Sequence, residues 1–289
     1  MAVYERNYHR YDGPLTSRRQ RFLVVPRYAL QAVMRSRAFV MFYLLCFLPP
    51  FAGLLMIYLR HNLSALNLLG IPLERLRQAL PIEAGFFSES LGLQGFLAFL
   101  MAVAVAPALI APDLRNNGLA LYLSRPFSRA EYMLGKLAVL ALLISTITWI
   151  PGILLYLLQG YLEGAGWFGE HLRVLGALVA GSWVLIVSLS LLALAVSAWV
   201  KWKPVARIVL VMLFFVSMGF GSVMELALGT WWSQMISFWR VIETVWAGLF
   251  GLPRPSGMPV GAAWVSLIGG SLLCLALLAR RVRAYEVVR

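Results

Sequence analysis

The side chains that most often carry catalysis are few in this chain. Its three histidines are His9, His61 and His171, and its two cysteines are Cys46 and Cys274. A serine protease needs a histidine base beside its nucleophile, and zinc sites draw mainly on histidine and cysteine ligands. The histidines all fall outside the long apolar segments, and the cysteines, both inside them, have no metal or disulfide spacing. The sequence therefore does not support a membrane protease or metalloenzyme.

The chain also lacks the glycine-rich loop with which many ATPases cradle phosphate. That loop reads G-x-x-x-x-G-K followed by serine or threonine. Here Gly135-Lys136 is followed by Leu137, and Ala130 stands where the first glycine belongs. We therefore expect that this chain does not hydrolyse ATP and carries no cofactor of its own.

One carboxylate, Glu225, lies inside an apolar segment. Transporters driven by a proton or sodium gradient usually place acidic side chains within the membrane. Counted along a helix from Ile208, Glu225 lies about 25 Å up, close to the outer boundary. An interfacial carboxylate is therefore a simpler interpretation than a proton relay. The chain is poorly equipped to energise transport by itself.

The composition shows what surrounds these groups. The 289 residues are 61% apolar and 13% charged, whereas soluble domains are about 45–50% apolar and about 25% charged. A membrane-spanning helix needs about 20 apolar residues. Six segments are long enough, namely 38–59, 93–110, 137–158, 174–200, 208–228 and 261–279. They predict an all-α integral membrane protein with six transmembrane helices over residues 38–279, between a tail at 1–37 and a basic tail at 280–289.

The basic residues are distributed unevenly between the two sides of these spans. Of the 25 lysines and arginines, 19 lie in the two tails and in the loops after spans two and four. By the positive-inside rule, this asymmetry places both termini in the cytoplasm. It also accounts for the net charge of +13, so nothing remains that would indicate nucleic-acid binding.

Two further segments have a membrane-surface pattern. Residues 26–37 predict an amphipathic helix that lies in the headgroup plane, against lipid or against a partner protein. Its apolar arc is Ala29, Leu30, Val33 and Met34, and its polar arc is Arg27, Gln31 and Arg35. Residues 229–260 are rich in tryptophan and predict helices that dip into the outer leaflet before span six. We interpret these tryptophans as an interfacial aromatic belt, with a substrate cage as the alternative.

The loop between spans two and three has more ordered structure than a connector needs. Residues 112–136 read PDLRNNGLALYLSRPFSRAEYMLGK. Ser128 and Glu131 form an S-x-x-E capping box that predicts the start of span three. A short helix before it would present Leu121 and Leu123 on a loop that water surrounds. The pattern indicates a docking surface for a partner protein.

The same loop resembles the cytoplasmic loop of ABC-2 type permeases. The shared pattern is an acid, Asn-Asn-Gly, Leu-x-x-x-Leu-Ser-x-Pro, Ser-Arg and Leu-Gly-Lys, with Asp113 where many members have Glu. Six spans, cytoplasmic termini, an N-terminal interface helix and an aromatic segment before the last span also match. The opening YERNYHRYDGPL is similar to bacterial members, which implies a bacterial inner membrane.

This resemblance implies a function and a set of contacts. In such permeases the loop is a coupling helix that sits in a groove of a separate ATPase subunit, which holds ATP and Mg²⁺. Six spans form half of a pathway, so a second permease copy or a paralogue is implied, and the resemblance favours export. The implied ATPase contacts are Asp113, Arg115, Asn117, Leu121, Leu123, Arg125 and Arg129 in the loop, with Arg27 and Arg35 on the interface helix.

Candidate pathway features are weaker. Pro49 and Pro50 in span one and Pro151 in span three predict kinks, which can mark where helices part during transport. Glu225 is the remaining candidate for the pathway.

The alternative to a transporter is a non-transporting membrane anchor whose ATPase acts in envelope assembly or maturation. Such an anchor would share all these features. A stand-alone membrane enzyme would need a polar catalytic cluster that the sequence does not offer.

The topology can be tested with reporter fusions. Reporters placed after Arg289 and after Trp167 are expected to lie on opposite sides of the membrane, because an odd number of expected spans separates them. An alkaline phosphatase and a fluorescent protein, active on opposite sides, would read out each position. Equal signals from the two positions would overturn the six-span assignment.

Overall fold

The computed structural model describes residues 24–62, 81–115, 128–200, 202–255 and 257–281. Regular structure in these ranges is entirely helical, and six of the helical segments are long and apolar enough to cross a membrane. They run over Arg37–His61, Ala84–Asp113, Arg129–Glu163, Leu172–Trp199, Lys203–Leu228 and Val260–Arg281. The prediction of six helices long and apolar enough to span a membrane is confirmed. The two tails are described only from Val24 onward and up to Arg281.

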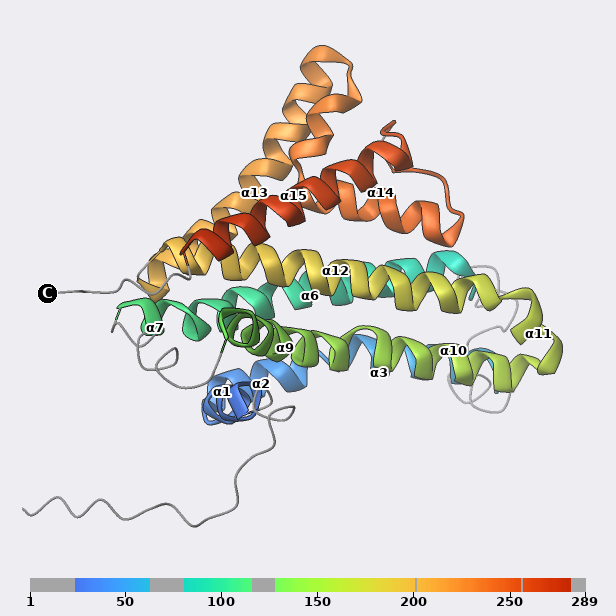
Figure 1. Ribbon diagram of the computed structural model, residues 1–289. Helices are drawn as coiled ribbons and strands as arrows, with labels where there is room; N and C mark the ends of the chain where they lie inside the picture. The colour runs from blue at the N-terminus through green and yellow to red at the C-terminus, as the bar shows by residue number, and fades with distance from the viewer. Residues whose placement is uncertain (1–23, 63–80, 116–127, 201, 256, 282–289) are drawn as a thin grey trace, which may run out of the picture.

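The spans form a bundle around a central pair of helices (Figure 1). This pair is α6 (Ala84–Leu109) of span two and α12 (Leu172–Trp199) of span four. On one side lie spans one and three. Span one consists of α2 (Arg37–Leu45) and α3 (Leu48–His61), and span three consists of α9 (Arg129–Ile147) and α10 (Trp149–Glu163). On the other side lie α13 (Lys203–Leu228) and α15 (Val260–Arg281), which are spans five and six. The short helix α7 (Ala111–Arg115) overlaps the end of span two, and the short helix α11 (Ala165–Glu170) follows span three.

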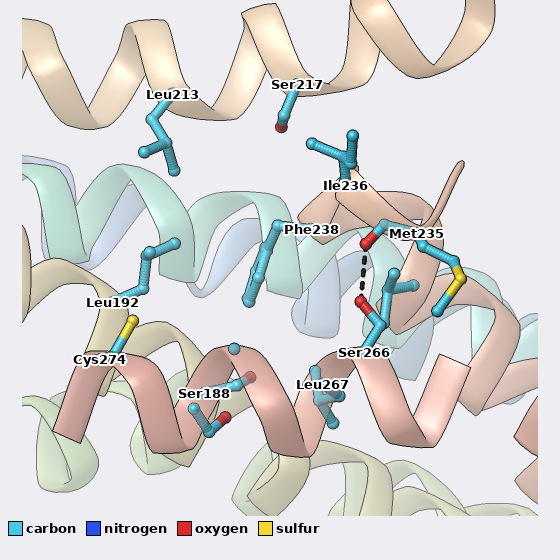
Figure 2. A pocket seen from close by; sticks show the side chains of 13 residues that line it. Ser188, Leu192, Leu213, Ser217, Met235, Ile236, Phe238, Ser266, Leu267 and Cys274 are labelled. Atoms are coloured by element: carbon cyan, nitrogen blue, oxygen red, sulfur yellow. Dashed lines mark hydrogen bonds between the residues drawn. The ribbon is translucent and has the colours of Figure 1, made fainter. Parts of the chain in front are cut away.

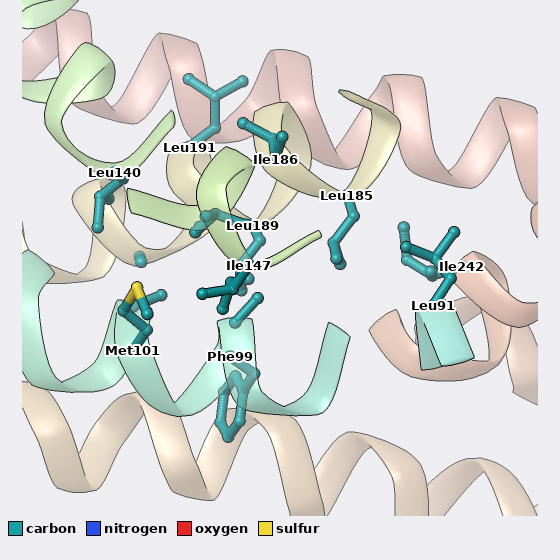
Figure 3. Close-up of a cluster of buried hydrophobic side chains, with 14 of the residues drawn as sticks. Leu91, Phe99, Met101, Leu140, Ile147, Leu185, Ile186, Leu189, Leu191 and Ile242 are labelled. Carbon is teal, nitrogen blue, oxygen red and sulfur yellow. The ribbon is translucent and has the colours of Figure 1, made fainter. Parts of the chain in front are cut away.

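Apolar packing is concentrated on the central pair. In the most apolar 18 residues of spans two and four, 61% are buried. The corresponding share is 17% in spans one and five and 11% in span six. Figure 3 shows Leu185 and Leu189 of α12 in one cluster with Met101 of α6 and Leu140 of α9. The outer helices thus keep broad hydrocarbon faces, which lipid or a second protein chain can cover.

Span two begins earlier than its hydropathy predicts. Helix α6 starts at Ala84 rather than near residue 93. The added turns contain Ser88 and Glu89, which lower the mean hydropathy, but Glu89 is exposed and Phe87 and Leu91 are buried. The helical pattern therefore continues past the purely apolar segment, with one face packed and the other polar.

Spans one and three are each broken into two helices just before a proline. In span one α2 ends at Leu45, and Pro49 and Pro50 stand in the first turn of α3. In span three α9 ends at Ile147, and Pro151 stands in the first turn of α10. Proline has no N–H and fits the first turn of a helix, where that donor is not needed. The expected kinks are present as breaks.

The N-terminal amphipathic helix is shorter than predicted. Helix α1 (Val24–Met34) packs on α9 and turns Ala29, Leu30 and Val33 toward the core. The predicted range 26–37 is wrong at its end, because Ser36 caps α2 by accepting a hydrogen bond from the Phe39 N–H at 3.4 Å.

The aromatic segment before span six is helical. It comprises the 3-10 helix η2 (Trp231–Ile236) and α14 (Phe238–Phe250), which packs against α12, α15 and α6. Trp232 is 64% exposed, as an aromatic belt requires. Trp246 is only 2% exposed, and its indole Nε1 donates to the Gly181 carbonyl oxygen at 3.0 Å. The belt interpretation is therefore wrong for Trp246, which belongs to the packed core.

The close approach of Trp246 to α12 can be tested with a pair of glycine substitutions. A Cβ at Gly181 would lie 2.9 Å from Trp246 Cδ1, whereas a Cβ at Gly176 on the same helix meets nothing within 4 Å. Gly181→Val should lower unfolding stability by about 1–3 kcal/mol through overpacking, while Gly176→Val should change it by less than about 0.5 kcal/mol. Thermal unfolding of both variants in detergent measures the difference. Equal midpoints would contradict the packing.

Candidate functional site

The loop between spans two and three is described at both of its ends. Its first helix, α7, follows directly on span two, and the description resumes at Ser128, just before α9. Arg115 and Arg129, at these two ends, are exposed. The other expected loop contacts lie outside the described residues, namely Asn117, Leu121, Leu123 and Arg125.

The end of the loop is fixed by the capping box that the sequence predicts. The Ser128 hydroxyl accepts from the Glu131 N–H at 3.2 Å, and the Glu131 carboxylate accepts from the Ser128 N–H at 2.6 Å. Two backbone donors that the first helical turn leaves without partners are satisfied in this way. The prediction of a helix start at Ser128 is confirmed, so span three begins at Arg129 rather than near residue 137.

A second set of contacts joins the beginning of the loop to α9. The Tyr132 hydroxyl donates to Asp113 Oδ2 at 2.8 Å, and Lys136 Nζ lies 2.9 Å from the same oxygen. The ammonium of Lys136 also lies 5.3 Å from the centre of the Tyr132 ring. We call these three residues, Asp113, Tyr132 and Lys136, the loop anchor.

The loop anchor is set in a largely buried position. Tyr132 is fully buried, and the side chains of Lys136 and Asp113 are 7% and 20% exposed. A cation in such a place needs a carboxylate partner, because removal from water is costly for an unpaired charge. Tyr132 and Lys136 are four residues apart, which places them on one face of α9. The carboxylate on α7 can therefore bind both at once.

This geometry changes the interpretation of Asp113. The resemblance assigns it to contact with an ATPase, but its carboxylate here has two partners within the same chain. Asp113 therefore joins α7 to α9, and its expected contact with an ATPase stays a prediction. Sequence reasoning missed Tyr132 and Lys136 as members of the site. The signal for them was a lysine on an apolar helix, one turn after a tyrosine. A lysine in such a place needs a nearby carboxylate as its partner.

The expected contacts on the N-terminal helix flank the same region. Arg27 lies on the exposed side of α1, and Arg35 lies exposed just after it. Because α1 packs on α9, both arginines belong to the end of the bundle that carries the loop anchor. At the other edge of this region the guanidinium of Arg115 stacks 5.7 Å from the Trp202 ring centre, which connects α7 to the start of α13.

The candidate pathway prolines stand at the breaks of two neighbouring spans, which contact each other on both sides of these breaks. The hydroxyls of Tyr43 and Thr146, just before the breaks, are 2.6 Å apart. Beyond the breaks, a Cβ at Gly53 would lie 3.1 Å from Leu155 Cδ2, so α3 and α10 pack closely. Pro50 and Pro151 are both buried.

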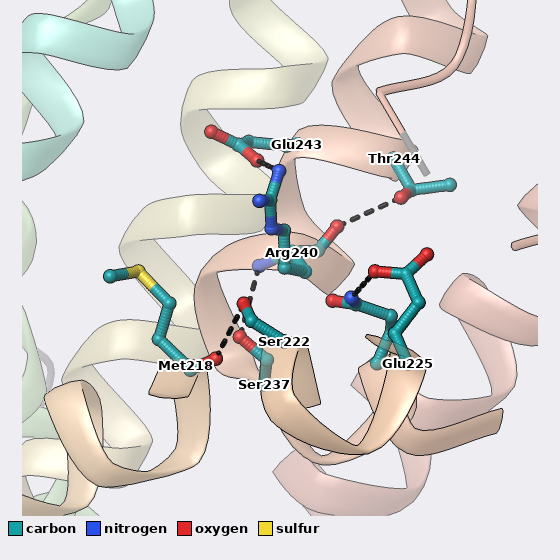
Figure 4. A network of polar contacts seen from close by, with 8 residues as sticks. Met218, Ser222, Glu225, Ser237, Arg240, Glu243 and Thr244 are labelled. Carbon is teal, nitrogen blue, oxygen red and sulfur yellow. Dashed lines mark hydrogen bonds and ion pairs between the residues drawn. The ribbon is translucent and has the colours of Figure 1, made fainter. Parts of the chain in front are cut away.

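Glu225 lies on another span, near the C-terminal end of α13. Its carboxylate accepts a hydrogen bond from the side-chain amide of Gln234 on η2 (Figure 4). Nearby, Arg240 of α14 pairs with Glu243 at 3.4 Å. The first contact joins η2 to α13 and gives Glu225 a structural partner, while the second lies within α14.

A cavity of about 270 Å³ lies where spans four, five and six meet (Figure 2). Three serine hydroxyls on its wall donate to backbone carbonyl oxygens, namely Ser188 to Val184, Ser217 to Phe214 and Ser266 to Met235. Apart from Ser271 and Cys274, the remaining wall is mainly hydrocarbon from leucine, isoleucine, phenylalanine and methionine side chains. The cavity therefore suits apolar groups.

The ion pair of the loop anchor can be tested by a double-mutant cycle. Asp113→Asn and Lys136→Met should each lower unfolding stability by about 3 kcal/mol, since each leaves a buried partner without its counter-charge. The double variant should lose much less than the sum of the two, and thermal or denaturant unfolding in detergent measures all three. Arg129→Ala, an exposed change on the same helix, should stay within about 0.5 kcal/mol. Additive losses would show that the two charges do not interact.

Comparison with known proteins leaves the architecture as the firm result. No family model matches the chain, and no curated protein matches it either. The described residues form an all-helical protein with six helices that are long and apolar enough to cross a membrane.

Proposed function

We propose that this chain is the permease subunit of an ABC-2 type transporter in a bacterial inner membrane, and that it takes part in export. In this proposal both termini are cytoplasmic. A second permease copy or a paralogue completes the pathway, and a separate ATPase subunit binds ATP and Mg²⁺ and docks on residues 112–136. The observation that supports the proposal best is the loop anchor.

A loop that only connects two spans does not need a buried ion pair. Here Asp113 from the beginning of the loop is bound to Tyr132 and Lys136 beyond its end, and Ser128 is held by the capping box. Both ends of the loop are thereby fixed to each other and to α9. A force applied to the loop is passed to the spans instead of being absorbed by bending of the connection.

The spans that carry the loop lead into the core of the bundle. Both α6 and α9 pack against α12, the most central helix. Because packed interiors resist compression, a displacement of the loop shifts these helices together. The breaks before Pro49 and Pro151 are then natural places for the outer halves of spans one and three to change direction.

The outer helices provide surfaces for a second permease chain. Only 17% of the most apolar window is buried in span five, and 11% in span six. Single scattered apolar residues on a surface need no partner, but whole helix faces need either hydrocarbon or protein cover. In a two-subunit pathway, part of this area would contact the second chain and the rest would contact lipid.

The proposal is tested by purifying the full chain from its native membrane and measuring ATP hydrolysis in the eluate. ATPase activity should co-purify with the wild-type chain. Burial of Leu121 and Leu123 is worth about 3–6 kcal/mol at most, so Leu121→Glu/Leu123→Glu should reduce co-purifying activity at least about 10-fold. Insertion of the variant into the membrane should be unchanged, because the loop lies outside the spans.

The matched control changes the charges of the same loop. Arg125→Ala/Arg129→Ala should reduce co-purifying activity only a few-fold, since an exposed ion pair contributes about 0–1 kcal/mol. If the leucine variant keeps all of the activity, the loop is not the docking surface. If the wild-type chain carries no ATPase activity at all, the proposed function is wrong.

A further inference from the structure

A large cavity opens beside the loop anchor, between the N-terminal helices and span five. Its volume is about 1,000 Å³, at the upper end of the range of about 300–1,000 Å³ for ligand pockets. Its wall is built from α1, α2 and α6, from Lys136 on α9, and from Lys203 and Arg207 at the start of α13. It therefore joins segments that are far apart in the sequence.

The charged groups of this cavity are all cations. Lys136 is neutralised by Asp113. Lys203 and Arg207 are exposed, and in the described part of the chain neither has a carboxylate within ion-pair distance. Arg207 Nη2 donates to the Ala104 carbonyl oxygen at 3.3 Å, which holds the guanidinium against α6 without cancelling its charge. Among the residues that the structure describes, these two positive charges of the cavity thus have no counter-ion.

The rest of the wall is mainly apolar. Phe39 and Phe42 of α2 and Leu100 of α6 line it, together with smaller alanine and valine side chains. A free anion would use the cations and leave this surface uncovered. A molecule with a hydrocarbon chain and an anionic head satisfies both parts. Basic pockets between membrane helices bind the head groups of anionic lipids in this way.

We infer that this cavity binds one anionic phospholipid, with its phosphate on Lys203 and Arg207 and an acyl chain along Phe39, Phe42 and Leu100. The position agrees with the topology, since Lys203 and Arg207 belong to the loop and span start that the positive-inside rule places at the cytoplasmic leaflet. The site goes beyond the proposed function and needs no ATPase. It would tie α1, α2 and α13 together from outside the protein core.

The N-terminal segment is the main competing occupant. Residues 1–23 directly precede Val24, which lines the cavity. They carry five arginines and only two acids, so Lys203 and Arg207 would repel them. Charge complementarity therefore favours a lipid phosphate over this segment.

The test measures binding of phosphatidylglycerol and phosphatidylcholine to the delipidated full chain in detergent, by native mass spectrometry. Wild type should prefer phosphatidylglycerol. Each cation near a lipid surface contributes about 1 kcal/mol, so Lys203→Gln or Arg207→Gln should lower this preference about 5-fold and the double variant about 30-fold. Ala108→Trp, at an exposed position on the cavity wall, should reduce phosphatidylglycerol binding while every charge is kept.

The matched control is Arg37→Gln/Arg280→Gln, which removes two exposed cations near the same end of the bundle but outside the cavity. Its lipid preference should equal that of wild type. An equal loss in this control, or equal binding of the two lipids to wild type, would overturn the site. Displacement of the lipid by millimolar inorganic phosphate would identify a free-anion site instead. A large gain in binding on deletion of residues 1–23 would identify that segment as the native occupant.

Discussion

The buried ammonium of Lys136 needs a counter-charge, and several parts of the structure together provide it. It sits on a helix face that is otherwise packed, where an unpaired charge would be very unfavourable. Asp113 reaches it from α7, which joins the end of span two to the beginning of span three. Tyr132, one turn earlier on α9, shares the same carboxylate oxygen and shields the pair from water. The contact between α7 and the start of α9 follows from satisfying this one cation.

Much of the fold follows from local properties that a sequence displays directly. Hydropathy over about 20 residues identified the six spans, and prolines marked the breaks in two of them. The S-x-x-E pattern located the start of α9 at Ser128. These features depend on neighbours along the chain, and their physical causes act within one or two helical turns. They are therefore readable without knowledge of the tertiary structure.

Features that depend on distant neighbours were missed or misjudged. The contacts of Asp113 with Tyr132 and Lys136 depend on the packing of α7 beside α9, and the sequence of the loop does not display that packing. Trp246 looked like an interfacial residue, since tryptophan is common there, but its partner is a carbonyl on α12. The end of α1 was also misjudged, because an uninterrupted amphipathic pattern concealed the cap at Ser36. In each case the deciding contacts are ones that the sequence alone does not display.

The break in span one also bears on how the protein fits bilayers of different thickness. Helix α2 has nine residues and α3 has 14, so they extend about 14 Å and about 21 Å at 1.5 Å per residue. Neither piece alone crosses a hydrocarbon core of about 30 Å, although the two together do. A continuous helix adjusts to a thinner membrane by tilting as one rod. A helix divided at residues 46–47 can shorten its transverse height by changing the angle between its halves, so its hydrophobic mismatch is absorbed at the joint.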